Sequence, residues 1–192
     1  KGGEPFLIHA YYKLWELIAH LNPSLKVTII SNATIMNTRV RGILEKINYQ
    51  LVVSVDSMIK ERYEAIRKGA VYHKTIENLT YFIQLSKTKP TEFPRIMMNV
   101  CMMSNNWDEA PEITTYCSSN KIAILFIMIQ DPVSLSLKHL GPLTLKVILK
   151  KLSVYDPNKI NNTEETALYT ANEIKDIIWY NKMIYDNMLF QI

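Results

Sequence analysis

The sequence contains only two cysteines among its 192 residues, Cys101 and Cys117. Two thiols are too few for a disulfide framework, and their spacing matches no metal-binding motif. An iron–sulfur cluster takes three or four thiolates, so this sequence cannot ligate one by itself. We interpret both cysteines as reduced thiols, which indicates a cytoplasmic protein.

Glycine is also scarce, with five residues, and no phosphate-binding loop of the Gly-x-Gly-x-x-Gly or Gly-Lys-Ser/Thr type occurs. This absence argues against a dinucleotide-binding or P-loop domain. A Gly-x-Ser-x-Gly elbow is missing too, and the histidines are scattered, so Ser-His-Asp hydrolysis is a poor fit. The histidines are His9, His20, His73 and His139.

No apolar run approaches the roughly 18 residues of a membrane span, and the longest run, 122–129, has the length of a strand. We expect neither a secretory signal nor a membrane partner. The formal net charge is +4 and the basic residues form no stripe, so we expect no nucleic-acid partner. The sequence lacks an initiator Met and opens in a predicted loop, so we expect it to be part of a longer protein.

What the sequence does have is an alternation of helical and strand patterns. The predicted strands are 26–31, 50–57, 95–103 and 122–129, and the predicted helices are 6–21, 37–47, 61–66, 71–85, 111–117, 141–152 and 166–189. The strands are nearly continuous in apolar residues, which is typical of strands covered on both faces. The alternation predicts an α/β fold with a parallel sheet, either doubly wound or a (β/α) barrel. A polar turn after Ser153 divides a 1–152 domain from a 153–192 helical extension.

Polar residues follow the predicted strand patterns at several points along the chain. In both architectures, ligands bind at the carboxyl ends of the strands. These exits are therefore the candidate functional positions, and they comprise Glu4, Ser31, Asn32, Ser54, Asp56, Asn105 and Asn106.

The opening loop has the chemistry of a site for a small polar cofactor. Gly2 and Gly3 have no Cβ, so the backbone can turn sharply and a ligand can approach closely. An ionised Glu4 only accepts hydrogen bonds, which suits an ammonium group. Pro5 can open a helix, because its missing N–H would be unpaired there anyway.

Four motifs follow one another along the first part of the chain. They are Gly2-Gly3-Glu4-Pro5; Ser31-Asn32-Ala33; Val53-Ser54-Val55-Asp56-Ser57 with the following helix Tyr63-Glu64-Ala65-Ile66-Arg67-Lys68-Gly69; and Asn105-Asn106-Trp107-Asp108-Glu109. In order and spacing they resemble the radical SAM superfamily, whose members use S-adenosylmethionine (SAM). The likeness is to the subgroup that modifies peptides and proteins.

The resemblance implies a partial (β/α)₆ barrel that lacks its first strand, its first helix and most of its second strand. It also implies a set of SAM contacts. Gly2, Gly3 and Glu4 would meet the amino group of SAM, Ser31 or Asn32 and Ser54 would hydrogen-bond its carboxylate or ribose, Asp56 would order its strand exit, and Asn105 or Asn106 would lie near the adenine or ribose.

The cofactors that the resemblance implies are SAM and a [4Fe–4S] cluster, with an electron donor and a peptide or protein substrate as partners. The family's three-cysteine loop is absent, so the cluster ligands would lie outside this sequence and the chain alone would be inactive. Ser57 and Ala33 stand where the family has glycine, which bears on the geometry of both turns.

Two other interpretations stay open. A doubly wound, flavodoxin-like domain shows the same alternation, although the sequence lacks a glycine-rich phosphate loop. A degenerate barrel would serve as a non-catalytic scaffold or peptide-binding module. The acidic pairs Asp108-Glu109 and Glu164-Glu165 suggest acid–base or metal chemistry, but we expect solvated helix starts, because acidic residues favour a helix N-terminus.

Overall fold

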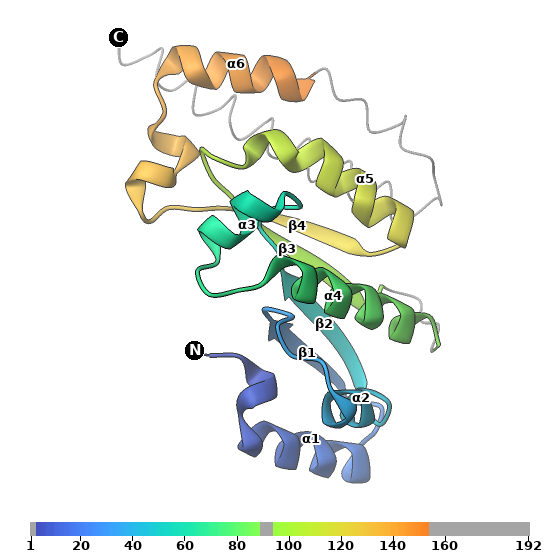
Figure 1. The fold of residues 1–192 in the computed structure, drawn as a ribbon. Helices are drawn as coiled ribbons and strands as arrows, with labels where there is room; N and C mark the ends of the chain where they lie inside the picture. The colour runs from blue at the N-terminus through green and yellow to red at the C-terminus, as the bar shows by residue number, and fades with distance from the viewer. Residues whose placement is uncertain (1–2, 89–93, 154–192) are drawn as a thin grey trace.

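The computed structural model describes residues 3–88 and 94–153. At its centre is a parallel sheet of four strands, joined in the order β1-β2-β3-β4 (Figure 1). The strands are β1 (Lys26–Ser31), β2 (Asn48–Ser54), β3 (Ile96–Met102) and β4 (Ala123–Met128). The predicted α/β class with a parallel sheet is therefore confirmed.

Helices precede, connect and follow these strands. They are α1 (His9–Leu21), α2 (Thr38–Leu44), α3 (Lys60–Ile66), α4 (Tyr72–Lys87), α5 (Ala110–Asn120) and α6 (Pro142–Ser153), with short 3₁₀ turns η1 (Pro5–Leu7), η2 (Trp107–Glu109), η3 (Val133–Leu135) and η4 (Leu137–His139). Each strand and helix predicted between 6 and 152 has a counterpart. The predicted helix 166–189 and most of the predicted extension 153–192 lie outside the described residues.

Several predicted boundaries are wrong by two or three residues, including the ends of the helices predicted over 37–47 and 111–117. Two differences bear on the site. The single helix expected over 6–21 is divided, because Ile8 is extended (φ −95°, ψ 109°) between η1 and α1. The Glu4 carboxylate caps η1 by accepting from the Phe6 N–H, which fixes a separate turn before the helix. The strand expected over 50–57 ends at Ser54. After it, the Asp56 side chain accepts from the Cys101 N–H in β3, and the Ser57 hydroxyl donates to Glu109 in η2.

One face of the sheet is buried beneath helices, and α4 and α5 lie in front of the sheet in Figure 1. Along β3, Ile96, Met98, Val100 and Met102 are buried, whereas the alternating residues are only half-buried. The opposite face leaves large apolar side chains exposed on β1 and β4, namely Ile30, Leu125 and Ile127. This strong difference between the faces corrects the expectation of strands covered on both sides.

The opening loop is anchored in the hydrophobic core. Phe6 is buried, and its ring packs edge-on against Trp15 of α1 and stacks on Phe82 of α4, with centroid distances of 5.8 and 6.2 Å. Tyr12 also donates a hydrogen bond from its hydroxyl to the Phe6 carbonyl. These contacts fix the position of Glu4 relative to the exit of β1.

Among the described residues, no helix combines the length and apolar character needed to cross a bilayer.

Candidate functional site

A pocket of about 610 Å³ opens at the carboxyl ends of β1 and β2. The exits of these strands contribute Asn32, Thr34 and Asp56 to its lining. The other side is formed by α3 and the turn after it, including Tyr63 and Arg67. The structure therefore brings together two of the predicted site residues, Asn32 and Asp56, in one pocket.

The pocket contains a carboxylate–guanidinium pair that sequence reasoning missed. Asp56 is 3% exposed, and its Oδ2 lies 2.8 Å from Arg67 Nε in an ion pair. Its Oδ1 accepts a hydrogen bond of 2.9 Å from the Cys101 N–H. Within the described residues, neither Nη atom of Arg67 has a hydrogen-bond partner, which leaves donors available to a ligand. The sequence signal was Arg67 itself, two residues before Gly69, where a helix was expected to end.

The pKa of the Cys101 thiol depends on burial and on the two charged residues of this pocket, Asp56 and Arg67. Burial raises the pKa of its thiol, Asp56 adds to the rise, and Arg67 opposes it. The thiolate fraction at about pH 8 is then below that of an exposed cysteine, so we expect slow alkylation by iodoacetamide that accelerates as the pH rises. Peptide mass spectrometry would follow the rate. The Asp56→Asn variant should react faster, and a rate equal to that of glutathione at every pH would contradict this prediction.

Glu4 joins the opening loop to the exit of β1. Its Oε1 accepts from the Ser31 hydroxyl at 2.8 Å, and its Oε2 accepts from the Asn32 N–H at 2.8 Å. Glu4 and Ser31 are both buried, at 7% and 2% exposure. The predicted site residues Glu4, Ser31 and Asn32 are thus brought together, with the first two engaged in hydrogen bonds to each other.

The two turns beside Glu4 adopt left-handed backbone conformations. Gly3 has a φ of 83°, which glycine adopts without a steric penalty. Ala33 has a φ of 57°, an uncommon value for a residue with a Cβ. Ala33 is held there by the bond from its N–H to Ser31 Oγ and by the bond from Asn78 Nδ2 to its carbonyl. Gly2 lies outside the described residues.

The remaining predicted residues lie at the exits of β2 and β3. Ser54 ends β2 and is half-buried, while Asn105 is exposed. Asn106 is fully buried: its Oδ1 accepts from the Met103 N–H, and its Nδ2 donates to the carbonyls of Asp56 and Cys101. Its amide therefore holds the two strand exits together, and it does not line the pocket beside Arg67.

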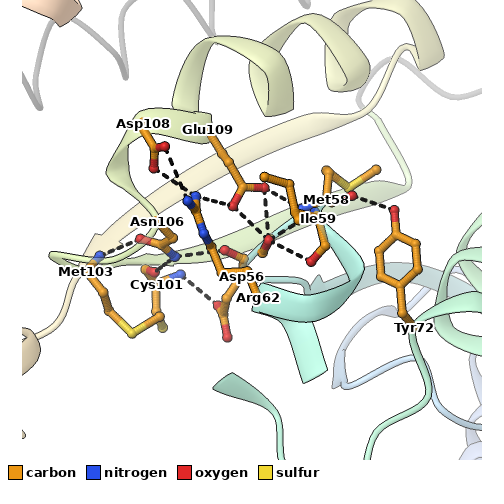
Figure 2. Close-up of polar contacts among 11 residues, drawn as sticks. Asp56, Met58, Ile59, Arg62, Tyr72, Cys101, Met103, Asn106, Asp108 and Glu109 are labelled. Carbon is orange, nitrogen blue, oxygen red and sulfur yellow. Dashed lines mark hydrogen bonds and ion pairs between the residues drawn. The ribbon is translucent and has the colours of Figure 1, made fainter. Parts of the chain in front are cut away.

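The expectation that Asp108 and Glu109 are both solvated is wrong for Glu109. Glu109 is 2% exposed and accepts hydrogen bonds from the Ser57 hydroxyl, the Met58 N–H and Arg62 Nη1. Figure 2 shows Glu109 beside Met58 and Arg62. Asp108 remains exposed and pairs with the same arginine. The hydrogen bond to Asp108 raises the pKa of Arg62, burial opposes the rise, and Glu109 adds to it.

No protein-family model matches the chain, and no curated protein is significantly similar to it in sequence. In the part of the chain that the structure describes, no three His, Cys, Asp or Glu side chains gather into a group able to hold a metal ion.

Proposed function

We propose that this chain is part of a radical SAM domain and that the pocket beside Arg67 binds SAM. The observation that carries the proposal is the Asp56–Arg67 pair at a strand-exit pocket. SAM has a carboxylate, which suits the Arg67 guanidinium, because its Nη donors have no partner among the described residues. The amide of Asn32 and the hydroxyl of Thr34 offer hydrogen bonds for the ribose. A volume of about 610 Å³ lies within the range of small-molecule sites.

The topology supports a partial (β/α)₆ barrel over a doubly wound sheet. The four strands follow chain order without a reversal, and right-handed crossovers between such strands put their helices on one face. A doubly wound sheet would reverse its strand order at the ligand site. The described part of the chain therefore favours the barrel interpretation.

The β1 side of the sheet is where a preceding barrel strand would fit. β1 is an edge strand in the described sheet, and Ile30 on it is 62% exposed. Leu14, Leu17 and Leu21 form an exposed apolar stripe on α1. A further parallel strand ending near Gly3 would pair with the free edge of β1, as in a β-α-β unit.

The residues of this chain would bind and orient SAM. Asp56 holds Arg67 for the carboxylate, and Glu4 holds the opening loop against the β1 exit. When bound beside a [4Fe–4S] cluster ligated outside this chain, SAM would supply a carbon radical able to remove a hydrogen atom from a peptide or protein substrate. An electron donor completes the proposed cytoplasmic system.

The test uses the full-length natural protein, purified without oxygen. We expect iron–sulfur absorbance and reductant-dependent formation of 5′-deoxyadenosine from SAM. Arg67→Met should lower product formation at limiting SAM by about tenfold, whereas Arg41→Met, on the exposed side of α2, should not. Absence of both cluster and product would overturn the proposal and favour the non-catalytic scaffold, for which peptide binding would be tested next.

A further inference from the structure

Glu109 is a buried carboxylate that does not line the pocket. Its partners lie on one short segment, directly after Asp56. Ser57 Oγ lies 2.7 and 2.9 Å from the two carboxylate oxygens of Glu109 and donates its proton to them. The Met58 N–H donates to Glu109 at 2.7 Å, and Arg62 Nη1 donates at 2.6 Å. A buried anion with this set of donors fixes the path of the chain from β2 into α3.

The helix α3 connects this cluster to the pocket. Arg62 lies in its first turn, whereas Arg67 is the residue that caps its C-terminal end. Arg67 is held there by the bond from its N–H to the Tyr63 carbonyl and by its ion pair with Asp56. A helix of seven residues thus has one end tied to Glu109 and the other end at the pocket.

We infer that Glu109 is a positioning residue for the pocket: by holding the start of α3, it keeps Arg67 against Asp56 and ready to receive the ligand carboxylate. The inference rests on the proposed function, because it concerns the same site. Asn106 supports the same arrangement from the other side, since its Nδ2 donates to the Asp56 carbonyl (Figure 2).

The ionised carboxylate of Glu109 suits this cluster because each of its partners there donates a hydrogen bond to it. A glutamine at this position would offer one acceptor oxygen and would turn an NH₂ group toward at least one of the donors. A buried donor left without an acceptor is unfavourable, so the segment from Ser57 to Arg62 would shift to find another partner. Such a shift would move α3 and Arg67 with it.

The test compares two ligands on the full-length protein without its cluster. S-adenosylhomocysteine carries the carboxylate, and 5′-methylthioadenosine lacks it. By calorimetry, we expect Glu109→Gln to lower the affinity for S-adenosylhomocysteine about tenfold and the affinity for 5′-methylthioadenosine less than about twofold. Ser57→Ala, which removes one donor and keeps the charge, should shift the same ratio less. Glu112→Gln, on an exposed position one turn further along α5, should leave both affinities unchanged.

A double-mutant cycle tests whether Glu109 acts on the ligand through Arg67. In an Arg67→Met background, Glu109→Gln should cause no further loss of S-adenosylhomocysteine affinity, because the coupled residue is already gone. Equal losses for both ligands, or undiminished binding by both the Glu109 and Ser57 variants, would overturn the positioning role while leaving the proposed function standing. Failure of the wild type to bind either ligand would overturn both.

Discussion

Replacing Asp56 by alanine is expected to cost about 3 kcal/mol of folding free energy and to weaken the binding of S-adenosylhomocysteine about tenfold. The side chain of Asp56 is only 5% exposed, and it serves both Arg67 and the Cys101 N–H. Alanine would leave a largely buried guanidinium without its counter-charge and a strand-exit N–H without its acceptor. Urea unfolding and calorimetry on the full-length protein would measure the two effects.

Asp108→Ala is the matched control for this prediction. Asp108 also forms an ion pair with an arginine of α3, but its side chain is 48% exposed. An exposed pair contributes about 1 kcal/mol or less, so the control should change stability little and affinity by less than about twofold. Equal losses of stability in the two variants would mean that the Asp56–Arg67 pair does not hold the pocket.

Asp56→Asn separates the charge from the hydrogen bond. Asparagine retains an oxygen that can accept from the Cys101 N–H, but it removes the charge that faces Arg67. We therefore expect its stability to lie between those of the wild type and the alanine variant. Its affinity for S-adenosylhomocysteine should be almost as low as that of the alanine variant. Full affinity in Asp56→Asn would show that the charge is dispensable for ligand binding.

The strands were predictable because their local sequence and their environment agree. Val27–Ile30 and Leu51–Val53 are short runs rich in apolar, mainly β-branched residues, which is typical of strands in a parallel sheet. Their order along the sheet then follows from the preference of consecutive strands to be neighbours. The predicted ends of elements failed beside side chains that bond to residues far along the chain, as Glu4 does before α1 and Asp56 does after β2.

The burial of Glu109 could not be read from the sequence. An acidic residue at a helix start is usually solvated, and Asp108 beside it is exposed. What buries Glu109 is a set of donors 47 to 52 residues earlier in the chain. Likewise, Glu4 is held by Ser31 and Asn32, which lie 27 and 28 residues later. Such contacts depend on how β1, β2 and β3 align, and no local pattern contains that information.

Glu4→Ala is expected to destabilise the protein by about 3 kcal/mol and to weaken SAM analogues strongly. The carboxylate receives three hydrogen bonds, from the N–H groups of Phe6 and Asn32 and from the Ser31 hydroxyl. Alanine would leave these donors without their acceptor and would release the opening loop from the exit of β1. Thermal unfolding and calorimetry would measure both losses, with Glu16→Ala on the exposed side of α1 as the control.

Glu4→Gln distinguishes two ways in which this residue can serve the ligand. Three of the roughly four acceptor positions of the carboxylate are already occupied within the protein. We therefore expect Glu4 to shape the loop, so that Glu4→Gln weakens S-adenosylhomocysteine and 5′-methylthioadenosine to the same degree. A loss confined to S-adenosylhomocysteine, which alone carries the amino acid moiety, would instead mean that Glu4 acts on that moiety, whose ammonium is the group that suits a carboxylate. The first outcome would leave the amino group to the backbone around Gly3, whose left-handed conformation permits close approach.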